Sequence, residues 1–372
     1  MTRAVEMLCE LVRLPTHHAD LAADAGDELA LCRHVAPWLA AAGADEVIVE
    51  ACPRASGHPG GYVFARFGTP RTLVNAHVDT VPANRGWSHD PWTPVVADGR
   101  VSGLGTADTK GAIVAATLAA QQVRPRDCGL LFSGDEERGT AAVKAFLASP
   151  HRAGVERAIV CEPTARRAGT AHRGVLAYRA TVRGHGGHSS RADHQPAPIV
   201  TMARLALAIH ELGVAARDRG PAGMPGLCMN VAGIDGGVAF NVIPEEAALT
   251  FSIRPAPGFD RAGWEAALAA AARAIDPAIT VACEVDHTPF GGGDDRGLHA
   301  LVAPHVEALV ALDFWTEAAL YQEAGIAAVV VGPGDIGRAH AADESVAVAD
   351  LDWAIALFVD VFTRLGSEAG RG

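Results

Sequence analysis

Apolar positions along the first 170 residues follow two different spacings. Some segments carry an apolar residue every three or four positions, which predicts helices at 2–13, 25–43, 109–122 and 140–149. Between them, short apolar runs predict buried strands at 45–50, 60–67, 71–78, 130–132 and 158–161. Because strands that alternate with helices form parallel sheets, we expect an α/β domain with a mostly parallel sheet.

The pattern changes between residues 171 and 286. The expected order there is strand, helix, strand, strand, helix, strand, at 175–182, 198–212, 228–234, 247–254, 261–275 and 279–285. This βαββαβ order is the split-βαβ, or ferredoxin-like, arrangement. Helix and strand patterns resume at 296–311, 327–331 and 350–365. We therefore predict that 171–286 is inserted into a discontinuous catalytic domain, made of 1–170 and 287–372.

The composition is that of a globular protein with a small-molecule substrate. The chain has 372 residues, 49% hydrophobic and 20% charged, which is enough for two domains of the usual size. Its formal net charge is −12, whereas proteins that bind nucleic acid present basic surfaces. We expect no nucleic-acid partner.

The sequence also predicts a cytoplasmic protein without a membrane segment. The N-terminal residues lack the apolar core of a signal peptide, and no stretch reaches the roughly 18 uncharged apolar residues that span a bilayer. The seven cysteines are scattered and form no C-x-x-C pair. We interpret them as reduced thiols in the core.

The first candidate site residues stand at the end of the predicted strand 71–78. His77 and Asp79 are two residues apart, so on a strand their side chains share a face. An imidazole that binds a metal usually needs a carboxylate to fix its orientation, which makes His77 a candidate ligand and Asp79 its partner. The alternative is a hydrogen bond between the two with no metal.

Acidic residues follow at the ends of further predicted elements. Asp108 lies in the glycine-rich segment 103–111, which fits neither a dinucleotide-binding turn nor a P-loop; it either caps the next helix or bridges metal ions. Glu136 and Glu137 come directly after a buried strand, where open α/β sheets bind their ligands, although acidic runs are often solvated loops.

Glu162 and His340 complete this set, each close after an apolar run. Each segment alone is ambiguous. Together they supply two imidazoles and several carboxylates, which suits a pair of zinc ions with mixed nitrogen and oxygen ligands better than calcium or a thiolate-rich site.

These segments, in this order, resemble the motifs of the co-catalytic zinc peptidase family, which includes acetylornithine deacetylase, succinyl-diaminopimelate desuccinylase, aminoacylases and glutamate carboxypeptidases. The resemblance extends over essentially the whole chain. It implies two Zn²⁺ ions, with Co²⁺ as a possible substitute. The implied roles are one zinc on His77 and Glu162, a second on Glu137 and His340, a bridge by Asp108, orientation of His77 by Asp79, and a general base at Glu136.

The resemblance also assigns residues of the inserted segment. His188, in Gly187-His188-Ser189-Ser190, is implied to reach a neighbouring subunit's active site and stabilise the oxyanion, so a homodimer is expected. Asn241 and Arg254 match segments that bind substrate, and the guanidinium of Arg254 suits an α-carboxylate. The alternative for Arg254 is a surface charge at a strand edge.

Within the family, segments 313–318 and 332–336 look most like acetylornithine and acetylcitrulline deacetylases. The implied activity is metal-dependent hydrolysis of the amide bond of an N-acyl-L-amino acid, foremost N-acetyl-L-ornithine in arginine biosynthesis. Acetylcitrulline deacetylase, desuccinylase-like and dipeptidase activities are alternatives, and a non-catalytic binding protein is an alternative of another class. Thr109 and the residues between His340 and Asp343 depart from the family's usual residues, which leaves side-chain specificity open.

Overall fold

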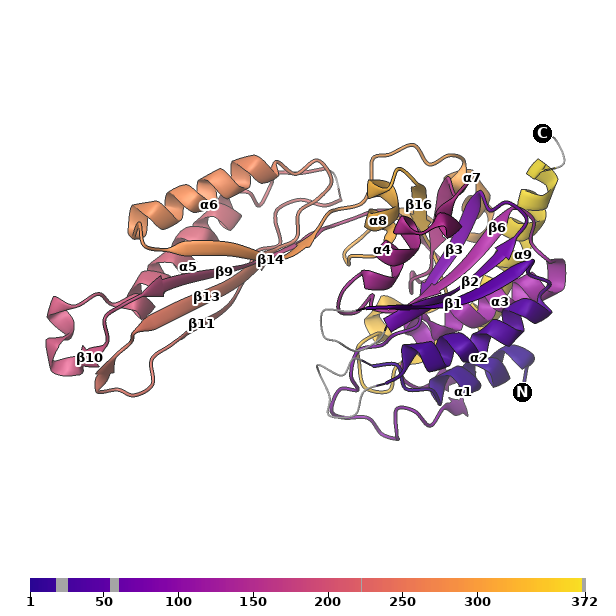
Figure 1. The fold of residues 1–372 in the computed structure, drawn as a ribbon, viewed down its shortest axis with the longest axis horizontal. Coiled ribbons are helices and arrows are strands. Elements are labelled where there is room, and N and C mark those ends of the chain that lie inside the picture. Colours follow the sequence, from indigo (N-terminus) through magenta and orange to yellow (C-terminus); the bar gives the residue numbers. More distant parts are fainter. Residues whose placement is uncertain (18–25, 54–59, 222, 370–372) are drawn as a thin grey trace. The chain divides into compact units, whose positions relative to one another are not determined.

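The computed structural model describes residues 1–17, 26–53, 60–221 and 223–369, and its contacts divide the chain into two compact units (Figure 1). Unit 1 consists of 1–170, 293–310 and 316–372, and unit 2 of 171–292 and 311–315. The sequence places the domain boundaries at 170/171 and 286/287. That these segments fold as separate domains stays a prediction.

Unit 1 is built around a mixed sheet with the strand order β1-β2-β6-β3-β7-β16-β8-β15. The strands are β1 (Glu46–Cys52), β2 (Gly60–Phe67), β3 (Thr72–His77), β6 (Cys128–Ser133), β7 (Arg157–Val160), β8 (Ala168–His172), β15 (Leu309–Leu312) and β16 (Ala327–Val330). The central strands β6, β3, β7 and β16 run parallel, while β1, β2 and β8 pair antiparallel. The predicted α/β class is confirmed.

Helices cover both faces of this sheet (Figure 1). One face carries α1 (Arg3–Val12), α2 (Glu28–Ala41), α3 (Gly111–Val123) and α9 (Val348–Ala369), and the other carries α4 (Ala141–Ala148) and α8 (Ala318–Glu323). The side chains of Thr2 and Asp27 cap the first turns of α1 and α2. Residue 25, where the predicted second helix begins, lies outside the described residues.

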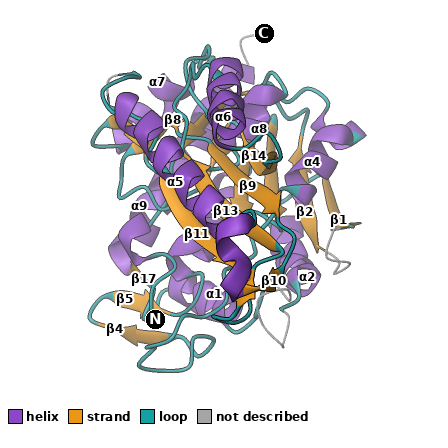
Figure 2. Ribbon diagram, turned by 90° about the vertical axis from the view of Figure 1, so that its left-hand side faces the viewer, coloured by secondary structure: helices purple, strands orange, loops and turns teal. Residues whose placement is uncertain are grey.

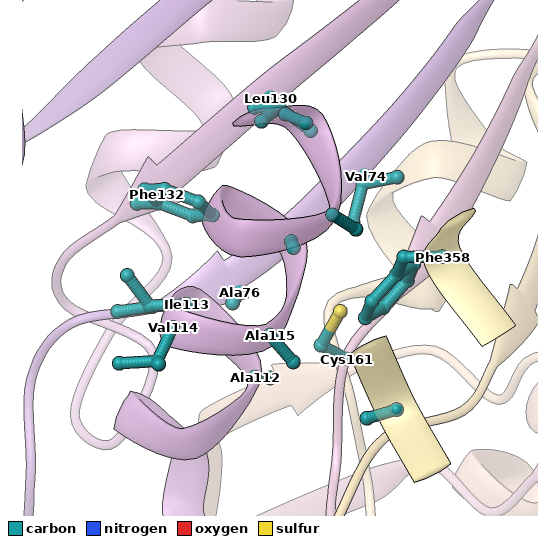
Figure 3. Packing of buried hydrophobic residues seen from close by; sticks show 14 of the residues in the cluster. Val74, Ala76, Ala112, Ile113, Val114, Ala115, Leu130, Phe132, Cys161 and Phe358 are labelled. Carbon is teal, nitrogen blue, oxygen red and sulfur yellow. The ribbon is translucent and has the colours of Figure 1, made fainter. Parts of the chain in front are cut away.

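The core of unit 1 fixes the strands that lead to the candidate site. Every residue of β3 and β6 is buried, and Val74, Leu130 and Phe132 pack against α3 (Figure 3). Phe358 of α9 lies in the same cluster as Cys161, which follows β7. Since burying one such side chain stabilises a fold by about 1.5–3 kcal/mol, the carboxyl ends of these strands are held in a rigid frame.

Unit 2 has the predicted βαββαβ order. Its elements are β9 (Val175–Arg183), α5 (Pro198–Ala215), β11 (Asn230–Gly236), β13 (Glu246–Ile253), α6 (Arg261–Ile275) and β14 (Thr280–His287). The sheet has the order β11-β13-β9-β14 with antiparallel pairing throughout, which is the ferredoxin-like arrangement. Both helices lie on one face of the sheet (Figure 2), where alternate residues of β9 are buried against them.

Several short elements are absent from the sequence-based prediction. A small sheet joins β4 (Val95–Ala97), β5 (Arg100–Ser102) and β17 (Ser345–Ala347), and a two-residue pair joins β10 (Gly187–His188) to β12 (Val242–Ile243). The segment 296–311 contains α7 (Leu298–Val302) followed by β15. The small sheet places the segment after His340 beside the loop that carries Asp108.

One described helix, α5, is long and apolar enough to cross a membrane by length and composition. It carries Arg204 and Glu211, and it buries Met202, Leu205 and Ile209 in the core of unit 2. Packing therefore accounts for part of its apolar character.

All seven cysteines lie within the described residues and are free thiols. Five are buried, as expected. Cys228 and Cys283 are exposed, so the prediction that all seven lie in the core is wrong for these two. Both belong to unit 2, where β11 and β14 form the two edges of the sheet.

Candidate metal centre

His77 ends β3 with its ring buried and both ring nitrogens in contact with oxygen atoms. Nδ1 lies 2.9 Å from the main-chain oxygen of Asp79, and Nε2 lies 2.9 Å from Oδ1 of Asp108. Because the carbonyl can only accept, Nδ1 carries a proton. Nε2 can then face the carboxylate in one of two ways: as part of an imidazolium, or with a cation bound between the two groups.

Asp108 faces two imidazoles at once. Its second oxygen, Oδ2, lies 3.3 Å from Nε2 of His340, while Oδ1 faces His77. The side chain does not cap α3, for which no side-chain cap hydrogen bond is present. A buried carboxylate whose two oxygens face different imidazole nitrogens has a geometry that suits a bridge between two ions.

His340 and Glu137 form the other end of the cluster. Nε2 of His340 lies 2.9 Å from Oε1 of Glu137, and hydrogen bonds to Asp108 and Glu137 raise the pKa of His340 to about 10. His77, Asp108 and Glu137 offer ligand atoms that all lie within 4.8 Å of one another. Ligand atoms around a tetrahedral zinc with bonds of about 2.0–2.2 Å lie roughly 3.3–3.6 Å apart. The 2.9 Å contacts of His77 with Asp108 and of His340 with Glu137 would therefore have to open slightly to admit an ion.

Asp79 holds the acidic segment through its main chain. Its Oδ1 accepts from the N–H of Glu136 at 3.2 Å, and its Oδ2 accepts from the N–H of Glu137 at 3.0 Å. The same carboxylate is 3.6 Å from Nδ1 of His77. Asp79 therefore links the strand end that carries His77 to the loop that carries both glutamates.

Negative charge dominates the cluster. Burial raises the pKa of Glu136 and of Glu162 well above the usual value, and nearby carboxylates add to both shifts. For His77 burial lowers the pKa, but hydrogen bonds to Asp108 and Asp79 outweigh burial and raise it well above the usual value. So many carboxylates beside two imidazoles are costly to bury unless cations neutralise them. The donor set and its excess negative charge both fit divalent metal ions.

Two further buried carboxylates border the cluster, and the sequence alone predicts a role for neither. Glu317 accepts a hydrogen bond from Ser133 at 3.2 Å, and burial raises its pKa to about 8. Glu344 accepts hydrogen bonds from the loop that carries Asp108. Glu317 is an isolated acid and Glu344 directly follows Asp343, and no spacing in the sequence shows that either side chain points into the site.

The remaining predicted site residues belong to unit 2. His188 is exposed, and its Nδ1 lies 2.8 Å from Oγ of Ser190. It pairs with Val242 across β10 and β12, which brings it close to the exposed Asn241. Arg254 follows β13 and is half-buried. The structure thus groups His188 with Asn241, while the roles of all three residues stay predictions.

Sequence comparison identifies relatives along most of the chain. A model of the peptidase family M20/M25/M40 matches residues 73–364. An N-acetyl-L-citrulline deacetylase from Xanthomonas campestris pv. campestris is 37% identical over 303 residues, which cover 78% of this chain and 80% of that protein. An acetylornithine deacetylase from Proteus mirabilis is 30% identical over 365 residues, covering 94% and 93%.

Solved structures share the fold. An M20-family metallo-carboxypeptidase from Sulfolobus solfataricus superposes with a TM-score of 0.76 at 15% identity and covers 98% of this chain and 99% of its own. A dinuclear metal-binding peptidase of the M20 family from Bacillus subtilis gives 0.68 at 14% identity, covering 98% and 97%. Taken with the family match over most of its length, these findings show that the chain belongs to the peptidase family M20/M25/M40.

Proposed function

We propose that this chain is a metal-dependent amidohydrolase that removes the acetyl group from N-acetyl-L-citrulline or N-acetyl-L-ornithine, a step that would serve arginine biosynthesis. The observation that carries the proposal is the Asp108 carboxylate between two imidazoles, with Glu136 and Glu137 beside them. The names of the relatives support an acetylated amino acid as substrate, and the higher identity to the citrulline enzyme makes N-acetylcitrulline the first substrate to test.

The residues present fit two divalent ions, either zinc or cobalt. One would be held by His77 and Glu162 and the other by Glu137 and His340, with Asp108 shared between them. When bound, such ions lower the pKa of a water molecule toward neutrality and polarise the amide carbonyl.

Glu136 is the proposed general base. Burial and the neighbouring carboxylates raise its pKa, and His77 offsets only part of this shift, so its carboxylate is a better proton acceptor than an exposed glutamate. It would accept a proton from the attacking water and pass it to the leaving amine. The hydrogen bond from the Glu136 N–H to Asp79 fixes the main chain from which this side chain projects.

Substrate contacts are proposed for three residues of unit 2. Arg254 would bind the α-carboxylate through its planar guanidinium, and Asn241 would hydrogen-bond the substrate. His188 would stabilise the oxyanion in a neighbouring subunit, which requires a homodimer.

Exposed apolar residues support a homodimer that forms through unit 2. They lie on α5 and β11, namely Ile199, Val200, Leu207, Val214, Val231 and Ile234. β11 is also an edge of its sheet, and such edges offer unpaired main-chain groups to a second strand.

A cytoplasmic location is proposed because all seven cysteines are free thiols.

The test is amide hydrolysis by chelator-treated protein, before and after zinc or cobalt is added back. The substrates are N-acetylcitrulline, N-acetylornithine and a simple dipeptide, which represents the peptidase alternative. Metal-restored hydrolysis of either acetylated amino acid supports the proposal. Hydrolysis of the dipeptide alone makes the chain a peptidase, and no hydrolysis by protein with metal demonstrably bound contradicts the proposed substrates.

A further inference from the structure

The loop that carries Asp108 is held by a carboxylate from a distant part of the chain. Three of its N–H groups point at Glu344. Oε2 accepts from Gly105 at 2.9 Å, and Oε1 accepts from Ala107 at 2.9 Å and from Asp108 itself at 3.1 Å. Glu344 is 2% exposed, so these hydrogen bonds form away from solvent. Charge-assisted hydrogen bonds of this kind are stronger than those between neutral groups.

The small sheet places Glu344 next to this loop. Ser345 pairs with Ser102 across β17 and β5, and the main-chain oxygen of Glu344 accepts from the N–H of Gly103 and from Oγ of Ser102, each at 2.9 Å. Both the main chain and the side chain of Glu344 therefore contact the segment that leads to Asp108. The position of the carboxylate depends on strand pairing and not on a flexible tail.

Other contacts fix the far side of the same loop. Oγ1 of Thr109 donates to the main-chain oxygen of His77 at 2.8 Å, and Nζ of Lys110 donates to the main-chain oxygen of Leu14 at 3.0 Å. Neither involves the N–H of Asp108. Among the contacts described for this loop, only the Glu344 carboxylate accepts hydrogen bonds both from the N–H of Asp108 and from N–H groups of residues that precede it.

We propose that Glu344 is a positioning residue for the metal centre: its carboxylate fixes the main chain of 105–108 so that the two oxygens of Asp108 face both imidazoles. Glu344 stands four residues after His340, so one short segment supplies a ligand and orients the bridge between the ions. The inference rests on the proposed two-metal site.

The effect is expected on metal affinity, even in protein that folds normally. Glu344→Gln keeps the size of the side chain but replaces one acceptor oxygen with an amide NH₂ group, which faces N–H groups that need acceptors. Loss of groups that orient metal ligands costs about 10–100-fold in metal affinity. We expect a loss of this size for at least one of the two ions, together with an altered Co²⁺ absorption spectrum.

The experiment measures Zn²⁺ affinity and stoichiometry by competition with a chromophoric chelator, in wild type, Glu344→Gln and Glu344→Asp. Glu344→Asp keeps the charge but is too short to reach all three N–H groups, and we expect an intermediate loss. The matched control is Ser345→Ala, one residue further along. It removes the hydrogen bonds that Oγ of Ser345 accepts from Nε of Arg100 and from Nη1 of Arg338, and it leaves the loop contacts of Glu344 intact. Circular dichroism of the metal-free proteins checks that each variant is folded.

The outcomes separate this inference from the proposed function. Wild-type affinity in folded Glu344→Gln contradicts the positioning role and leaves the two-metal site standing. If Glu344→Gln does not fold, the metal affinity of Glu344→Asp decides: unchanged affinity overturns the role and weakened affinity supports it. A wild-type chain that binds no metal contradicts both.

Discussion

At the scale of single residues, three successive acids have three different environments. Asp135 has a left-handed backbone, with φ of 67°, and its Oδ2 accepts from the first N–H groups of the α4 region at 3.1 and 3.0 Å. Glu136 is half-buried with a raised pKa, and Glu137 contacts His340. The segment is therefore not a solvated acidic loop. Each carboxylate has its own partners, and substitutions should separate their effects.

Glu136→Gln should remove most of the turnover while the protein still binds two metal ions. An amide of the same size cannot accept a proton, and the loss of a general base typically costs about 10²–10⁴-fold in rate. Glu137→Gln, one residue away, should instead reduce the amount of bound metal. Metal content by mass spectrometry and kcat on the acetylated substrate are measured for both variants. Substantial turnover by the Glu136→Gln variant would show that Glu136 is not the general base.

The sequence predicts His77, Glu137 and Glu162 because each stands at or soon after the end of an apolar run that becomes a strand. His77 and Glu137 come together since β3 and β6 are parallel neighbours whose carboxyl ends meet. What the sequence does not predict is the main-chain hydrogen bonding. The Asp79 carboxylate accepts from Glu136 and Glu137, whereas a main-chain oxygen of Asp79 contacts His77. Such contacts depend on loop conformation, which leaves no periodic signal in the residues.

At the scale of elements, the parallel pair β7 and β16 brings two loops together. Glu162 follows β7, and the turn Gly332-Pro333-Gly334 follows β16. A Cβ on Gly332 would lie 2.8 Å from the main-chain oxygen of Glu162 and 3.1 Å from its nitrogen. The absence of a side chain at this position is thus what allows the turn to approach Glu162.

Gly332→Ala should displace the main chain of Glu162 and weaken metal binding. Forcing an extra carbon into a packed region typically costs about 1–3 kcal/mol, so the urea midpoint should fall as well. The matched control is Gly337→Ala, where the nearest atom to a new Cβ is Oδ1 of Asp335 at an ordinary 3.4 Å. Equal metal affinity and stability in the two variants would show that the turn tolerates the methyl group.

Long elements are predictable from the sequence and short ones are not. The helices α3 and α9 and the strands β3 and β6 have apolar patterns that extend over several turns or residues. By contrast, β5 and β17 have three residues each and form because they pair with one another across the chain. Tertiary pairing of this kind cannot be read from local periodicity. For the same reason the sequence predicts no role for Glu344, which stands next to β17.

At the scale of the whole molecule, the exposed apolar residues of α5 and β11 form a surface of unit 2 that a second copy of the chain could cover. Leu207 of α5 is 68% exposed, and Val200 on the same helix is 50% exposed. The helix lies beside the edge strand β11, so apolar side chains and unpaired main-chain groups are close together. A two-fold interface presents the same patch from both copies, and a self-complementary apolar patch meets that condition.

Leu207→Asp should convert the dimer into a monomer. In the free chain the residue is largely exposed, and surface substitutions usually change stability by less than about 0.5 kcal/mol, so folding should survive. In the dimer the change would bury an unpaired carboxylate, which is strongly unfavourable. Sedimentation should give wild type at twice the 38.5 kDa chain mass and the variant at the single mass. The control, Val96→Asp, changes an exposed apolar residue of unit 1 and should leave the dimer intact.

The same variant tests whether catalysis requires the second copy. If His188 acts in a neighbouring subunit, the Leu207→Asp monomer should bind metal normally yet lose most of its kcat. A fully active monomer would show that His188 acts in the active site of its own chain or has no catalytic role. A wild-type chain that sediments at the mass of one chain at all concentrations would contradict the proposed dimer. The exposed apolar residues of α5 and β11 would then not be covered by a second copy.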